Sequence, residues 1–186
     1  MRICRVAISY PTSQFPGAGL VNYYLSNILK SKTLYITIKR PGIPKKKISK
    51  NLKIKFIDTP LQKSSTSLNH QLHDKSSNFI TKLIVYIKII SSGRSFNFFR
   101  KSIIPILRFK PDLIACHSNL TIIHGYFFKT FFNIKYVLHL HAISDVIAIQ
   151  NYYIIKYMAS KAERIYCVSE PMQNQLKKIF PTNKIF

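Results

Sequence analysis

The sequence predicts an α/β fold in which a parallel β-sheet is covered by helices on both faces. From residue 113 onward, short and continuous apolar runs alternate with segments of helical periodicity, which is typical of buried parallel strands joined by helices. The hydrophobic content of 47% is that of a folded protein. A chain of 186 residues is long enough for one hydrophobic core. We therefore expect a single Rossmann-like domain.

The first part of the chain has the pattern of a β-loop-α unit followed by two further strands. Residues 3–9 are mostly apolar, and a loop containing Gly17 and Gly19 follows them. The next predicted elements are a helix over residues 20–30 and strands over residues 33–39 and 52–57. Residues 62–78 lack periodicity, and we assign no structure to them.

The second part of the chain begins with two apolar stretches that predict helices, residues 79–90 and 96–109. Neither reaches the roughly 18–20 uninterrupted apolar residues of a transmembrane helix. The elements predicted after them are strands over residues 113–116, 135–140 and 165–168 and helices over residues 120–132, 146–159 and 171–179.

The chain is strongly basic, with 29 Lys and Arg against 6 Asp and Glu and a formal net charge of +23. Such a charge favours an anionic partner, and nucleic acid, anionic lipid and a phosphorylated substrate all fit it. A general bias of the source toward lysine would give the same excess. The charge alone therefore does not choose a partner.

The cysteines and the amino terminus bear on location. Cys4, Cys116 and Cys167 lie within or at the end of β-rich apolar runs and lack C-x-x-C spacing, which predicts buried, reduced thiols. The first apolar run is too short for the hydrophobic region of a signal peptide. We expect a cytoplasmic protein.

The glycine loop predicts proximity to a phosphate. In Gly17-Ala18-Gly19, the small residues let the backbone approach an anion, and the helix that follows directs free N–H groups and its dipole toward it. The alternative is a simple tight turn into that helix. Binding of NAD or FAD is disfavoured, because Asn22 stands where a third glycine is needed and Arg40 where an acidic residue is expected.

Five segments, in order, carry a family resemblance. They are YPTSQFPGAG at residues 10–19, KPDLIACHS at 110–118, YVLHLHA at 136–142, AERIYCVSE at 162–170 and NKIF at 183–186. Together these segments resemble family-4 glycosyltransferases of the GT-B architecture, and they span nearly the whole chain.

The resemblance implies that residues 1–186 form the N-terminal, acceptor-side Rossmann-like half of a GT-B fold. The chain ends on the strand that in relatives leads to the second, donor-binding domain, so we expect that domain to be absent. Joined to a C-terminal donor half, the chain is expected to transfer a sugar from a nucleotide-sugar to a glycan, polysaccharide or lipid-linked acceptor. The isolated chain is expected to be inactive. No cofactor is expected beyond the nucleotide-sugar substrate.

The resemblance also implies roles for strand-end residues. His141 follows a predicted parallel strand, at the edge where open α/β sheets bind ligands, and is expected at the reaction centre beside the donor sugar. A neutral imidazole could exchange hydrogen bonds there, and a protonated one could stabilise the leaving diphosphate. Gly17 to Gly19 are expected near the donor diphosphate. His117 and Ser118 are expected to line the acceptor cleft. For both histidines the alternative is a structural core or loop residue.

The sequence supports a functional role less strongly for several other polar residues. His139 should share a face with His141, but the sequence offers no third metal ligand, so we expect His139 to be a buried, hydrogen-bonded neighbour and no metal to bind. Ser169 and Glu170 lie at a strand-to-helix turn, where serine can cap the helix. Glu163 and Glu170 do not match the family's two-glutamate motif, because six residues separate them instead of seven.

A basic α/β module that binds nucleic acid or an anionic membrane surface without catalysis is the alternative function. No recognised nucleic-acid motif is present, so we expect no specific nucleic-acid partner. Residues 79–109, flanked by basic residues, could instead dock on the inner face of a membrane, which is compatible with a lipid-linked acceptor. Residues 79–90 could equally be an ordinary buried helix.

Overall fold

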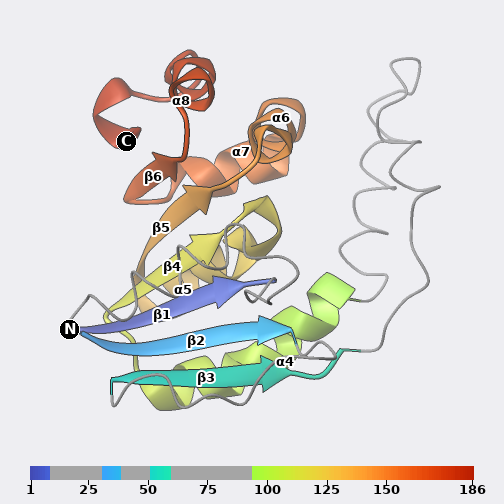
Figure 1. Ribbon diagram of the computed structural model, residues 1–186, viewed down its shortest axis with the longest axis vertical. Coiled ribbons are helices and arrows are strands. Elements are labelled where there is room, and N and C mark those ends of the chain that lie inside the picture. Colours follow the sequence, from blue (N-terminus) through green and yellow to red (C-terminus); the bar gives the residue numbers. More distant parts are fainter. Residues whose placement is uncertain (9–30, 39–50, 60–93) are drawn as a thin grey trace.

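The computed structural model describes residues 1–8, 31–38, 51–59 and 94–186. Within these ranges, six strands form one sheet (Figure 1). The strands are β1 (Arg2–Ala7), β2 (Lys32–Ile38), β3 (Leu52–Ile57), β4 (Leu113–His117), β5 (Lys135–Leu140) and β6 (Arg164–Cys167). The helices in the same ranges are α4 (Arg94–Phe109), α5 (Ile122–Phe132), α6 (Ile143–Asn151), α7 (Tyr153–Ser160) and α8 (Glu170–Lys177), with 3₁₀ turns η1 (Asn119–Thr121) and η2 (Thr182–Lys184).

The strands lie in the order β3-β2-β1-β4-β5-β6, and every neighbouring pair is parallel. The chain builds the sheet from β1 outward to β3, returns to the middle, and continues from β4 to β6. The reversal between β1 and β4 is the topological switch point of a doubly wound sheet. The Rossmann-like parallel sheet predicted from the sequence is confirmed.

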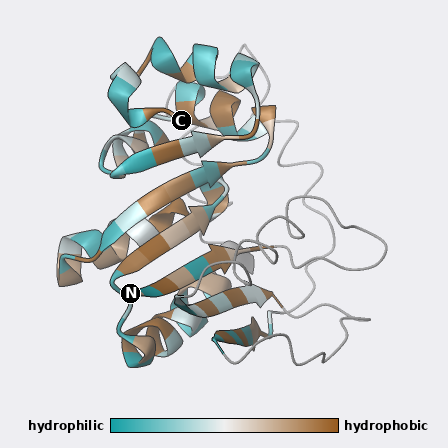
Figure 2. Cartoon of the chain, turned by 60° about the vertical axis from the view of Figure 1, so that its left-hand side comes forward, coloured by the Kyte–Doolittle hydropathy of each residue, from teal (hydrophilic) through white to brown (hydrophobic). Residues whose placement is uncertain are grey.

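The main hydrophobic core lies between the described helices and one face of the sheet. Alternate strand residues such as Val6, Ile36 and Cys116 point into this core, and each of the five described helices adds apolar residues to it. Figure 2 shows the hydrophobic colouring concentrated along the strands. The opposite face carries two smaller buried clusters, around Tyr35 and around Val137. The helices predicted over residues 20–30 and 79–90 lie outside the described residues.

The predicted strands agree with the observed ones to within two residues at each end. The helix predicted over residues 146–159 is wrong, because it is two helices, α6 and α7. They meet at Tyr152, which is extended, with φ −115° and ψ 110°. Its N–H still donates to the Ala148 carbonyl (3.0 Å) and its carbonyl accepts from Lys156 N–H (2.9 Å), so the break keeps both backbone hydrogen bonds.

The last residues pair alongside β6. Ile185 forms a parallel bridge with Ile165, and Phe186 N–H donates to the Ile165 carbonyl at 2.9 Å. The resemblance implied a strand at NKIF, and the structure shows a single parallel bridge there.

Two further predictions concern the thiols and the membrane. All three cysteines are free, and Cys4 and Cys116 are buried as predicted, whereas Cys167 is half-buried. None of the described helices is long and apolar enough to cross a bilayer.

Candidate active site

Four charged or titratable side chains gather where β1, β4 and β5 end, beside the switch point of the sheet. Arg5 lies on β1, His117 is the last residue of β4, His139 is on β5, and His141 follows β5. The strand register pairs Arg5 with Ala115 and His117 with His139, so all four share one face of the sheet. Open α/β sheets bind their ligands at this edge.

A chain of hydrogen bonds joins three of these side chains. Arg5 Nη1 lies 3.4 Å from His117 Nε2, and His117 Nδ1 lies 3.2 Å from His141 Nε2. Because a guanidinium can only donate, His117 must accept at Nε2, and a neutral His117 then carries its proton on Nδ1. That proton is donated to His141 Nε2. It follows that a neutral His141 carries its own proton on Nδ1, where no described residue accepts a hydrogen bond from it.

The surroundings keep the histidines neutral. Burial lowers the pKa of His117 well below its usual range, and the neighbouring His139, Arg5 and His141 lower it further. Burial, with Arg5 and His141, lowers the pKa of His139 to about 3. Burial also lowers the pKa of His141, and the Asp145 carboxylate partly opposes this. Of the two states that the sequence left open for His141, the structure favours the neutral imidazole.

Aromatic stacking extends the site along the ends of β4, β5 and β6. The His117 ring stacks on His141 and on His139, with centroids 5.5 and 4.7 Å apart, and His139 stacks in turn on Tyr166 at 4.9 Å. His139 was expected to be a buried, hydrogen-bonded neighbour. The structure places it half-buried, and its ring contacts among the described residues are stacking contacts. The stack holds the plane of His117 between two other rings.

Asp145, which no sequence pattern singled out, connects the two loops that carry the histidines. It lies in the first turn of α6 and is only 6% exposed. Its carboxylate accepts hydrogen bonds from the backbone N–H of Asn119 (3.1 Å), after β4, and of His141 (3.4 Å), after β5. Burial raises the pKa of Asp145, and the backbone N–H donors of Asn119, His141 and Ala142 lower it. The sequence signal for Asp145 was its rarity, because the chain has only 6 acidic residues.

Arg5 was also missed. It is 4% exposed, and its Nε has no hydrogen-bond partner within the described residues. A lone cation inside the otherwise apolar first strand was the signal in the sequence, since a charge is buried only at a cost that some partner must offset. Among the described residues, His117 accepts a hydrogen bond from Arg5, and Tyr35 also favours the charged form of Arg5.

Ser118 has a strained backbone at the same edge. Its φ is 104°, a conformation that residues with a side chain rarely adopt. Its N–H donates to the His139 carbonyl at 2.9 Å, and its carbonyl accepts from the Thr121 hydroxyl at 3.1 Å. The Ser118 hydroxyl is buried without a partner among the described residues. Strain of this kind is concentrated at functional sites, which supports the prediction that His117 and Ser118 border a ligand.

The remaining predictions concern the turn before α8, the glycine loop and metal binding. Ser169 occupies the N-cap position of α8, but its hydroxyl makes no cap hydrogen bond, so the predicted side-chain cap is wrong. Glu170 stands in the first turn of α8, where its charge suits the helix dipole. Gly17, Ala18 and Gly19 lie outside the described residues. Among the residues that the structure describes, no three His, Cys, Asp or Glu side chains are placed to hold a metal ion.

Residues 69–185 match the family model described as Glycosyltransferase Family 4. The chain belongs to this family. The matched segment contains β4, β5 and β6 and therefore His117, His139, His141 and Asp145.

The fold of this family-4 chain is similar to that of several solved structures. The match to sucrose-phosphate synthase from Thermosynechococcus elongatus covers 96% of this chain and 45% of that enzyme, with a TM-score of 0.61 and 12% identity. For Anabaena HepE, solved with UDP and glucose, the shares are 100% and 43%, with a TM-score of 0.58 and 12% identity. For a trehalose-phosphate synthase from Burkholderia vietnamiensis they are 98% and 43%, with a TM-score of 0.56 and 8% identity.

These identities show the fold alone, which is the N-terminal Rossmann-like domain of a GT-B protein. No curated protein matches the chain. The family-4 chain spans somewhat less than half the length of the solved sucrose-phosphate synthase.

Proposed function

We propose that this chain is the acceptor-side half of a two-domain glycosyltransferase and that the reaction centre lies at His141. The observation that carries the proposal is the hydrogen-bonded row of Arg5, His117 and His141 at the switch-point edge of a family-4 chain. An edge of this kind is where ligands bind in doubly wound sheets. A half-buried histidine there can reach a ligand while its neighbours fix its orientation.

In this proposal, His141 acts as a neutral hydrogen-bond donor. Arg5 and His117 commit its Nε2 to accepting a hydrogen bond, so its Nδ1–H is the group left for a ligand. Breaking the bond between the donor sugar and its diphosphate leaves negative charge on the departing phosphate oxygen. A donor that is already oriented stabilises such charge without a reorganisation cost. The buried Arg5 adds positive potential from beneath the histidines.

Asp145 positions this donor instead of contacting substrate. Its carboxylate accepts from the His141 N–H and from the Asn119 N–H, and it thereby holds together the loops after β5 and β4. A fixed backbone at His141 keeps the ring within the narrow range of positions that catalysis tolerates.

A nucleotide-sugar is the proposed donor. The similar HepE was solved with UDP and glucose, and a Phytolacca americana enzyme of the same fold with UDP-2-fluoro-glucose. Gly17, Ala18 and Gly19 are proposed to approach the diphosphate. The acceptor is proposed to be a glycan, polysaccharide or lipid-linked sugar that enters past His117 and Ser118, in the cytoplasm or at the inner face of a membrane.

Transfer of a labelled sugar tests the proposal. We expect the 186-residue chain alone to transfer no sugar and to bind nucleoside diphosphates weakly at most, because the donor site is assigned mainly to a second domain. Adding that donor domain, covalently or as a separate half, should produce transfer. Turnover by the isolated chain, free of contaminating enzyme, would show that the donor site is misplaced.

A further inference from the structure

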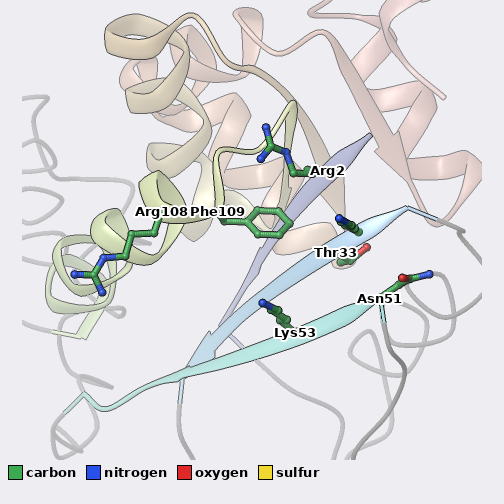
Figure 3. A pocket seen from close by; sticks show the side chains of 7 residues that line it. Arg2, Thr33, Asn51, Lys53, Arg108 and Phe109 are labelled. Carbon is green, nitrogen blue, oxygen red and sulfur yellow. The ribbon is translucent and has the colours of Figure 1, made fainter.

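A basic hollow lies at the edge of the sheet opposite the histidines. It has a volume of about 290 Å³ and is bordered by the first residues of β1, β2 and β3 and by the end of α4. Figure 3 shows the side chains that line it, which come from β1, β2, the start of β3 and the end of α4. Because all the strands are parallel, their amino ends and their carboxyl ends lie on opposite edges. The hollow is therefore separate from the proposed reaction centre.

The hollow contains more positive charge than the composition explains. Lys and Arg make up 29 of 186 residues, so seven lining residues would include about one by chance, 7 × 29/186. Four are present: Arg2, Lys32, Lys53 and Arg108. The general lysine bias of the chain does not account for this concentration.

These four cations are not balanced by carboxylates in the part of the chain that the structure describes. None of their side chains forms an ion pair with a described residue. The carboxylate of Asp112 lies at the same edge and accepts a hydrogen bond from the backbone N–H of Arg2 at 2.7 Å, not from its guanidinium. Like charges held around one cavity repel each other, and an anion with several negative charges relieves that repulsion.

The uncharged residues that line the hollow indicate that its anionic ligand has an organic part. The half-buried Phe109 gives the hollow an apolar side, and Thr33, only 1% exposed, closes its base. The Thr33 hydroxyl donates to the Ser31 carbonyl at 3.4 Å and so keeps its oxygen as an acceptor for a ligand hydroxyl. Arginine and lysine side chains together suit phosphate oxygens, the former with two parallel hydrogen bonds and the latter as point charges.

We propose that this hollow binds the phosphate groups of a small organic anion, either a soluble phosphorylated sugar or the headgroup of an anionic lipid. The site is independent of sugar transfer at His141. Its ligand is held by Arg2, Lys32, Lys53 and Arg108, with Phe109 against the organic part.

Calorimetric titration at constant, near-physiological ionic strength tests the proposal. The probes are inorganic pyrophosphate, glucose 6-phosphate, and vesicles of phosphatidylglycerol compared with phosphatidylcholine. We expect Lys53→Gln/Arg108→Gln to weaken binding by about tenfold or more, since two charge-assisted contacts are lost. The matched control is Lys55→Gln/Arg100→Gln, which removes the same two charges from exposed positions on the same strand and helix, outside the hollow. It should change binding by less than about twofold.

The outcomes separate the two ligand sources from nonspecific attraction. Binding of the soluble phosphates that depends on Lys53 and Arg108 supports a soluble ligand, and such binding of the anionic vesicles alone supports a lipid headgroup. Equal weakening in both double variants, or no binding of any probe, overturns the proposal. His141→Ala should leave this binding unchanged; if it abolishes the binding, the anion occupies the transfer site and the proposal is also overturned.

Discussion

Single residues set the chemistry of the histidine row, and Arg5 is the one on which the others depend. It fixes which nitrogen of His117 accepts and, through His117, which nitrogen of His141 donates. Two neutral histidines alone could exchange these roles, because each ring nitrogen can be donor or acceptor. A buried arginine removes that freedom, since it has no acceptor to offer.

Replacing Arg5 should therefore allow His117 and His141 to populate both neutral tautomers. In Arg5→Met, we expect the imidazole ¹⁵N shifts of His117 and His141 to move from one Nδ1–H form toward a mixture, and the pKa of His139 to rise because one of the causes that lowers it is gone. Arg5→Lys, which keeps the charge, should restore most of the pKa effect. NMR titration of the three proteins measures both quantities, and identical spectra for Arg5→Met and the native chain would contradict the role of Arg5.

His124 predicts a pH dependence of stability. It is fully buried between Phe98 and Phe99, its Nε2 lacks a partner among the described residues, and burial lowers its pKa to about 4. The unfolded chain takes up a proton at His124 near its ordinary pKa of 6.5, whereas the folded chain resists protonation until about 4. The contribution of His124 to the free energy of unfolding should thus be at its maximum above pH 6.5. It should decrease between pH 6.5 and about 4, by up to ~1.4 kcal/mol per pH unit.

Denaturant unfolding of His124→Gln checks that dependence. The variant cannot take up the proton, so its free energy of unfolding should fall less steeply between pH 6.5 and 4 than that of the native chain. Parallel curves for the two proteins would show that His124 is not held neutral by the fold.

Among the elements, α5 approaches the sheet more closely than a side chain would allow. A Cβ at Gly125 would lie 2.4 Å from Cδ2 of Tyr136 and 2.9 Å from Sγ of Cys116. Tyr136 cannot move aside easily, because it is fully buried and its hydroxyl donates to the Met158 carbonyl. The position of α5 in turn sets η1 and the loop that follows His117.

Gly125→Ala should therefore destabilise the fold despite the better helix propensity of alanine. Overpacking of this kind typically costs about 1–3 kcal/mol, and each kcal/mol lowers the melting temperature by roughly 2–4 °C in a chain of this size. Thr130→Ala, at an exposed position of the same helix, should change stability by less than about 0.5 kcal/mol. Thermal denaturation of both variants measures this, and a Gly125→Ala melting temperature equal to that of the native chain would rule out the close contact.

The elements were predictable to different degrees. The strands β4 and β5 are short apolar runs bounded by polar residues, so the local pattern of apolar residues predicted their positions. The break between α6 and α7 did not, because residues 143–160 contain no proline or glycine, and Tyr152 leaves the helix without losing a backbone hydrogen bond. Periodicity detects a helical face, but it does not detect a bend that tertiary packing imposes.

On the scale of the whole molecule, the strand order brings together residues that lie far apart in the sequence, and no local sequence pattern predicts such contacts. His117 and His141 were predictable, because each follows an apolar run at a strand end. Their contact with Arg5 required the β1–β4 neighbourhood, which is set by strand order and not by any local pattern. The basic hollow likewise joins residues from the first and the middle part of the chain, and in the sequence its cations were indistinguishable from the general excess of lysine.

Turnover of His141→Ala in the chain joined to the proposed donor domain tests the central claim most directly. His141 is half-buried at a sheet edge, so its truncation should leave no core cavity and should keep the melting temperature and the nucleotide affinity close to native values. The loss should fall on the transition state and lower turnover by on the order of 10²- to 10³-fold. His139→Ala, which removes a ring stacked between His117 and Tyr166, should instead lower the melting temperature. Near-native turnover of His141→Ala would contradict the placement of the reaction centre at this histidine.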